Sequence, residues 1–249
     1  MLYKTLGIVL RYFNFSEADK IVTLYTSRFG KIKAVVKGVR KTKSRFGSSM
    51  ELFTNSNLLL HHKENRDLYL VTQSSIVDSF KELKNNLNKL YKASYIVEVI
   101  DTLVKGSEKN QVLFNLIISA FSMLRHTDRE SDSEAILRLF EIKFLTVLGY
   151  KLKLDRCSLC NKEFNNDKYF VSDTRFGILC KNCSADYYKK TSYPITKNSM
   201  DFMKSMQNEE MKDYLKLKLS NQNLAELKKV LPNFIRYYAE KEMNSFKFI

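Results

Sequence analysis

Four cysteines in two Cys-x-x-Cys pairs are the residues of this chain best suited to chemistry. Cys157 and Cys160 form the first pair, Cys180 and Cys183 form the second, and nineteen residues separate them. Each pair can direct two thiolates from one tight turn at one metal ion, so the spacing predicts one tetrahedral zinc ion per chain. Four protein ligands leave no position for water or substrate, and the predicted zinc is therefore structural.

Two other interpretations of these cysteines are open. The pairs could be buried separately and never meet, or they could form two disulfides. The chain has no other cysteine, which favours a single site that uses all four. A thiol oxidoreductase uses one Cys-x-x-Cys pair near a βαβ unit, whereas this chain has two pairs in a helical context.

The composition indicates a globular protein that binds a polyanion. With 249 residues, 44% of them hydrophobic, the chain can bury a sizeable core, and it lacks the apolar run of about 18 residues that a membrane span needs. Its first residues, MLYK, lack the order of a signal peptide, so we expect a cytoplasmic protein with reduced cysteines and no membrane partner. The net charge of +15 favours DNA, RNA or an acidic protein tail as partner.

The positive charge is concentrated near the N-terminus. Residues 1–75 hold 13 Lys and Arg against 5 Asp and Glu, and residues 20–50 contain no acidic residue. The predicted DNA-binding cations of this run are Arg28, Lys31, Lys33, Lys37, Arg40, Lys41, Lys43 and Arg45. Such a run either stays solvated or meets an anion, and we expect contacts to phosphates without base-specific readout. Tyr25, Phe29 and Phe46 could stack on bases or fill a core, and a core position is expected for Tyr25.

The short β-rich runs of the first 75 residues predict a small β-barrel. Short β-rich runs lie at 6–10, 21–26, 31–37, 52–60 and 67–72. Five short strands in this length suit an OB-fold, with an SH3-like barrel as the nearest competitor.

From about residue 79 the pattern becomes helical. Apolar residues recur at three- and four-residue spacing, and Ser131 with Glu134 fits a capping box at the start of an apolar helix that Gly149 ends. The zinc module interrupts this region at 155–188. The predicted fold class is α+β: a five-stranded OB-fold barrel for nucleic-acid binding at 1–78, followed at 79–249 by an all-helical domain with an inserted four-cysteine zinc module.

The order of several motifs resembles that of bacterial RecO recombination mediator proteins. The matching segments are GIVL (7–10), EADKIVTLYT (17–26), FGK (29–31), KGVRKTKSR (37–45), LGY (148–150), LDRCSLC (154–160), FVS (170–172) and GILC (177–180). The resemblance covers residues 1 to about 185, and the last 60 residues show only helical character. Asn161 departs from the pattern, because glycine is expected after the second cysteine.

The resemblance implies a non-enzymatic role in recombinational DNA repair. Members of this family bind single- and double-stranded DNA, anneal complementary strands and act with RecR to load RecA, so RecA is an indirect partner. They also engage the single-stranded-DNA-binding protein. A cytoplasmic, nucleoid-associated location follows from these partners.

Two other functions are alternatives to this one. An RNA-binding OB-fold protein of translation would share the barrel and the charge. A zinc-dependent nucleic-acid enzyme would need catalytic groups, but His61, His62 and His126 lie in no recognisable motif and the chain has no phosphate-binding loop. Glu17 and Asp19 form a pair of carboxylates for which a local structural or partner-contacting role is expected.

Overall fold

The structure is a computed structural model that describes the chain except for residues 64–66, 165–167, 173, 188–191, 209–218 and 241. Its packing separates two compact units. The first holds residues 1–125 with 248–249, and the second holds residues 126–247. No helix within the described part of the chain is long and apolar enough to cross a membrane.

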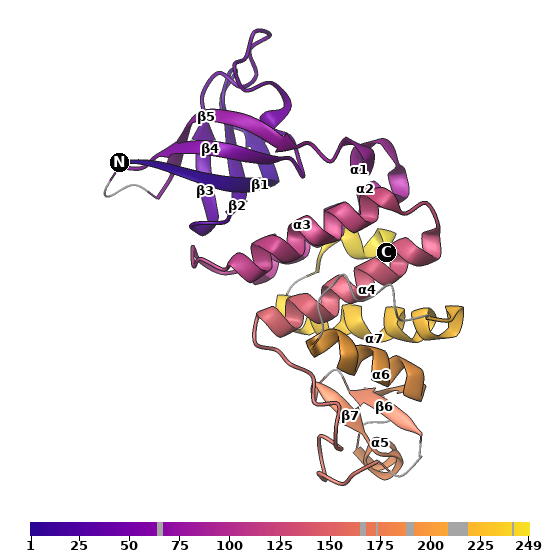
Figure 1. Cartoon of the computed structure of the whole chain (residues 1–249). Helices are drawn as coiled ribbons and strands as arrows, with labels where there is room; N and C mark the ends of the chain where they lie inside the picture. The colour runs from indigo at the N-terminus through magenta and orange to yellow at the C-terminus, as the bar shows by residue number, and fades with distance from the viewer. Residues whose placement is uncertain (64–66, 165–167, 173, 188–191, 209–218, 241) are drawn as a thin grey trace. The chain divides into compact units, whose positions relative to one another are not determined.

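Five strands close into a barrel at the start of the first unit (Figure 1). They are β1 (Leu2–Asn14), β2 (Lys20–Thr26), β3 (Gly30–Val36), β4 (Asn55–His61) and β5 (Tyr69–Asp78). The order around the barrel is β1-β2-β3-β5-β4, and only the β3–β5 pair is parallel. Five strands in a closed Greek-key order are OB-like, so the predicted barrel is confirmed.

The strand boundaries differ from the predictions at several places, and β5 runs from Tyr69 to Asp78 where 67–72 was predicted. The predicted fourth strand began near residue 52, but Phe53 has a φ of 67° and β4 begins only at Asn55. A left-handed residue cannot continue a strand, and the N–H of Phe53 instead donates to the Val9 carbonyl at 3.0 Å. The first strand runs past the predicted end at residue 10, because polar and aromatic residues extend it as a hairpin with β2.

Alternating apolar residues of the strands fill the barrel. Alternation is clear in β3, where Ile32, Ala34 and Val36 are buried and Lys33 is exposed, whereas β2 is buried along nearly its whole length. The buried cluster comprises Val9, Val22, Leu24, Ile32, Ala34, Val36, Phe46, Met50, Leu58, Leu60 and Val71. Burial of a large side chain of this kind contributes about 1.5–3 kcal/mol, so the barrel has the core that an independent element needs.

Three helices complete the first unit: α1 (Lys81–Asn85), α2 (Leu87–Leu103) and α3 (Gln111–His126). Two phenylalanines with left-handed backbones, Phe53 and Phe80, both pack edge-on against Phe121 of α3, at ring-centroid distances of 5.6 and 5.3 Å. Arg125 lies over the Phe80 ring and pairs with Asp78 at the end of β5. These contacts fix α3 to the last strand of the barrel.

The second unit combines helices with a small sheet. Its elements are α4 (Glu130–Val147), β6 (Tyr169–Ser172), β7 (Gly177–Leu179), α5 (Lys181–Tyr187), β8 (Ser192–Ile195), α6 (Lys197–Asn208), α7 (Asn221–Ala239) and a 3-10 helix (Asn244–Phe248). The antiparallel sheet has the order β7-β6-β8. The α+β class is confirmed, although β8 lies beyond the predicted end of the zinc module at residue 188.

Helix α4 lies at the centre of this unit, and most of its apolar side chains are buried. It packs against both α6 and α7 (Figure 1). The predicted capping box is wrong: the helix begins at Glu130, with Arg129 as N-cap residue and no side-chain cap. Glu134 pairs instead with the fully buried Arg138, one turn along, at 3.2 Å. Gly149 does follow the helix with a φ of 87°, as expected of a residue after a helix end.

Candidate metal centre and nucleic-acid surface

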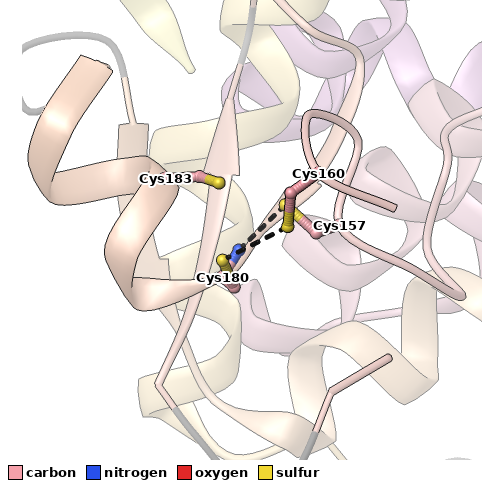
Figure 2. A group of neighbouring side chains, drawn as sticks. All are labelled: Cys157, Cys160, Cys180 and Cys183. Atoms are coloured by element: carbon pink, nitrogen blue, oxygen red, sulfur yellow. Dashed lines mark hydrogen bonds between the residues drawn. The ribbon is translucent and has the colours of Figure 1, made fainter. Parts of the chain in front are cut away.

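The two Cys-x-x-Cys pairs come together from separate parts of the second unit. Cys157 and Cys160 lie in a turn before β6, Cys180 directly follows β7, and Cys183 lies in the first turn of α5. Figure 2 shows the four side chains grouped around a common space. All four Sγ atoms lie within 4.8 Å of one another. The interpretation as two pairs that never meet is therefore wrong.

The sulfur distances fit a tetrahedral metal site. The Sγ atoms of Cys160 and Cys180 are 3.8 Å apart. With a Zn–S bond of about 2.3 Å, the edge of a tetrahedron of sulfurs is about 3.8 Å. A disulfide would bring two sulfurs to about 2.05 Å, and all four cysteines are free thiols.

The electrostatics of the thiols also suit a cation. Burial by itself raises the pKa of Cys157, but N–H groups of Cys160, Cys180 and Leu159 donate to its sulfur and bring the pKa down to about 6. Burial raises the pKa of Cys183, and the neighbouring thiols raise it further. The lowered pKa makes Cys157 the thiol that ionises readily, whereas the raised pKa of Cys183 opposes a second thiolate beside it. A bound Zn²⁺ would remove this conflict, because it deprotonates the thiols that coordinate it.

The backbone around the first pair depends on two special positions. Asn161 has a φ of 60°, and its N–H donates to the Cys157 carbonyl at 2.9 Å to close the turn. Asparagine is one of the few residues that tolerate this left-handed conformation, which explains how it can stand where glycine was expected. A Cβ atom on Gly177 would lie 2.2 Å from the Ser158 Oγ, so the close approach of β7 to the turn requires glycine.

The predicted DNA-binding cations follow β3 and the loop after it. Lys31 and Lys33 lie on β3, Arg28 lies in the preceding turn, and the other five lie in the segment that leads to the 3-10 helix Gly47–Met50. Seven of the eight are exposed: Arg28, Lys33, Lys37, Arg40, Lys41, Lys43 and Arg45. Lys31 differs, because its ammonium group donates to the Asp101 carbonyl at 2.7 Å and lies 3.6 Å from the carboxylate. This lysine therefore attaches β3 to α2.

The cationic loop is held to the β1–β2 hairpin by three hydrogen bonds. The N–H of Gly38 donates to Asp19 Oδ1 at 2.8 Å, and the N–H of Arg40 donates to the Ala18 carbonyl at 3.0 Å. The Arg40 guanidinium reaches the Ser16 carbonyl at 2.7 Å. The local structural role expected for Asp19 is thus confirmed: it orders the loop that carries the cations.

The three aromatic residues singled out in the sequence contribute mainly to packing within the first unit. Tyr25 is fully buried, burial raises its pKa to about 12, and its hydroxyl donates to the Asn110 carbonyl at 3.4 Å. Phe46 is buried in the barrel core, and Phe29 packs on Tyr3 and Tyr69. The core position expected for Tyr25 is confirmed. The aromatics that are exposed on the hairpin, Tyr12, Phe13 and Phe15, were missed, although the run YFNF is visible in the sequence.

Family models cover nearly the whole chain. One, described as "Recombination protein O N terminal", matches residues 1–80, and another, "Recombination protein O C terminal", matches residues 84–246. The chain belongs to the RecO family. The resemblance seen in the sequence is therefore confirmed, and DNA repair is the process in which this family acts.

Individual relatives in the RecO family match this chain over most of their lengths. A "DNA repair protein RecO" of Desulforamulus reducens is 33% identical over 248 residues, which cover 100% of this chain and 94% of the relative. A protein of the same name from Syntrophus aciditrophicus is 30% identical over 98% of this chain and 94% of its own length. A third, from Clostridium kluyveri, is 31% identical over 92% of this chain and 86% of its own.

Among the residues that the structure describes, the histidines of this RecO family member form no further metal site. His62 stacks on Tyr69 with ring centroids 4.3 Å apart, next to the end of β4. Within the described residues, the four cysteines are the one group of His, Cys, Asp and Glu side chains close enough to share a metal ion. Chemistry at a second metal therefore has no support there.

Proposed function

We propose that this protein is a non-enzymatic recombination mediator that binds single- and double-stranded DNA and anneals complementary strands. The observation that carries the proposal is the row of exposed cations between Arg28 and Arg45, in a stretch with no acidic residue and fixed to the β1–β2 hairpin. Lysines and arginines held in one loop can neutralise several phosphates and release their counterions. Annealing follows, because a cationic surface that holds two strands at once screens their repulsion.

We assign DNA binding to the barrel at 1–78, which the helical domain at 79–249 follows. RecR, the single-stranded-DNA-binding protein and, through RecR, RecA are the proposed protein partners. One structural zinc ion, held by the four cysteines, would support the region around β6, β7 and α5. We place the protein in the cytoplasm, at the nucleoid.

Strand annealing is the experiment that tests this function. Complementary labelled oligonucleotides are mixed across a protein titration, with and without ATP and with and without the single-stranded-DNA-binding protein. We expect acceleration without ATP that falls with added salt. The rate should pass through a maximum and then decline when protein exceeds DNA, because separately coated strands no longer share one protein.

The two alternatives are separated in the same assay. A strict requirement for ATP, or no acceleration over naked strands at any ratio, would leave a plain nucleic-acid-binding module. Tighter binding of matched RNA than of single-stranded DNA would favour a role in translation, and metal-dependent turnover of the oligonucleotides would favour an enzyme.

A further inference from the structure

Three aromatic side chains are exposed on the β1–β2 hairpin. Tyr12, Phe13 and Phe15 are 39%, 47% and 60% exposed. Tyr25, Phe46 and Phe53, in the same unit, are almost completely buried. An exposed ring lacks the stabilisation that burial would contribute. Several exposed rings on one hairpin therefore indicate a partner that covers them.

The register of the hairpin places rings on both of its faces. Tyr12 pairs with Val22, Phe13 with Ile21, and Asn14 with Lys20, so Tyr12 and Phe13 point to opposite sides. The ammonium group of Lys20 lies 3.8 Å from the centroid of the Tyr12 ring. The Phe15 N–H donates to the Asp19 carbonyl, which holds Phe15 at the turn. A cation thus already lies against one ring near the turn of the hairpin.

The same hairpin anchors the cationic loop. Arg40 bonds to the carbonyls of Ser16 and Ala18 through its guanidinium and its N–H, and Gly38 bonds to the Asp19 carboxylate. The carboxylate of Asp19 is therefore occupied by a backbone donor, and Glu17 is the remaining acid of the turn, exposed to solvent. The exposed rings and the exposed cations are thus carried by one hairpin and by the loop that is bonded to its turn.

We propose that the β1–β2 hairpin is a base-stacking platform for single-stranded DNA, with Phe13 and Phe15 as its main contacts. This inference rests on the proposed DNA binding and adds a preference for unpaired bases. A single strand offers apolar base faces and phosphates together, as the rings and cations require. A duplex hides its base faces, and an apolar protein partner would make no use of the adjacent cations.

The decisive test compares binding of an oligo-dT and of a blunt duplex to the full-length chain at several salt concentrations. Stacking of one base typically contributes about 5- to 100-fold in affinity. For the variant Phe13→Ala with Phe15→Ala we expect oligo-dT binding to weaken at least about 10-fold, duplex binding to change less than about 3-fold, and the salt dependence to stay the same. The matched control is Ile76→Ala with Val77→Ala, which truncates two side chains of β5 that are 45% and 51% exposed.

A second variant reports stacking directly. The protein contains no tryptophan, so Phe13→Trp introduces one fluorophore. We expect oligo-dT to quench its emission and the duplex to leave it unchanged. If the wild-type protein binds no DNA, the proposed function fails. If it binds DNA but the alanine variant binds oligo-dT as tightly as the control, or the tryptophan is not quenched, the stacking platform is overturned and the hairpin belongs to a protein contact.

Discussion

Phe176 of the β6–β7 connection stacks on Tyr238 of α7, with ring centroids 4.6 Å apart. The same ring packs on Phe234 and Tyr237, at 5.8 and 4.8 Å. Phe176 has a φ of 49°, a conformation that is unfavourable for a bulky residue and persists only where the surroundings hold it. The hairpin that carries Cys180 is therefore attached to the last long helix of its unit by an aromatic cluster.

Loss of one cysteine should loosen this attachment without unfolding the barrel. Cys180→Ser removes one of four proposed zinc ligands, and zinc binding contributes about 10–16 kcal/mol in small peptide sites. We expect the wild-type protein to contain one zinc per chain by elemental analysis. In the variant, amide exchange should rise in β7 and α7 and remain unchanged in β2. A fully folded wild-type protein that contains no zinc would refute the metal site.

Removal of exposed loop cations should lower the salt dependence of DNA binding. If about six phosphates of a single strand are neutralised, log K against log salt has a slope of roughly −4. The variant with Lys37, Lys41 and Lys43 changed to alanine should bind all sequences more weakly, with a slope closer to zero by about 2. The charge-matched control changes the exposed lysines Lys63, Lys81 and Lys105. Equal slopes in the two variants would move the binding surface away from the loop.

The turn of the first cysteine pair should accept glycine and reject a β-branched residue at position 161. Asn161→Gly keeps the left-handed conformation available, so zinc affinity should stay within about 3-fold. Asn161→Val adds about 1–2 kcal/mol of backbone strain and should weaken zinc binding about 5- to 30-fold. Competition with a coloured chelator measures the zinc affinity of both variants. Equal affinities for the two variants would show that the conformation at Asn161 does not limit the site.

Glu226 should make the second unit sensitive to acid. Burial opposes its ionisation, but donors from Ser199, Thr196 and Gln222 outweigh this and lower its pKa below the usual 4.5. Because the folded-state pKa is the lower one, the stabilisation is complete above about pH 4.5 and is lost as pH falls through the folded pKa.

The variant Glu226→Gln isolates this effect. The substitution should lower the free energy of unfolding at neutral pH by about 1–2 kcal/mol. The variant should also lose less stability than the wild type between neutral pH and pH 4. Urea unfolding of α6 and α7, followed by amide exchange, measures the difference. Gln222→Ala is the control, since it removes the more exposed of the donors to Glu226. Parallel pH profiles for Glu226→Gln and the wild type would contradict the assignment.

The sequence predicted those features that depend on local patterns. Short β-rich runs indicated the barrel strands, and the Cys-x-x-Cys spacing indicated the cluster of sulfurs, because each pattern is set by a few neighbouring residues. The sequence did not predict features that depend on packing between residues far apart in the chain. Phe53 leaves the predicted strand because Phe121 of α3 holds its ring, and Ser131 does not cap α4 because the helix already begins at Glu130. Lys31 looked like its neighbouring cations until Asp101, seventy residues later, proved to be its partner.

The closure of the barrel has a consequence for the nascent chain. Strand β1 pairs with both β2 and β4, and β5 closes the seam to β3. After β3 has left the ribosome, about 40 further residues must emerge before β5 is complete, which takes roughly 2–8 s at bacterial synthesis rates. During this interval β1 and β3 present unpaired edges that can join to another growing chain. The lysines of β3 and of the loop after it repel a like-charged neighbour, so the cations that we propose to bind DNA also oppose association of the unfinished protein with its own copies.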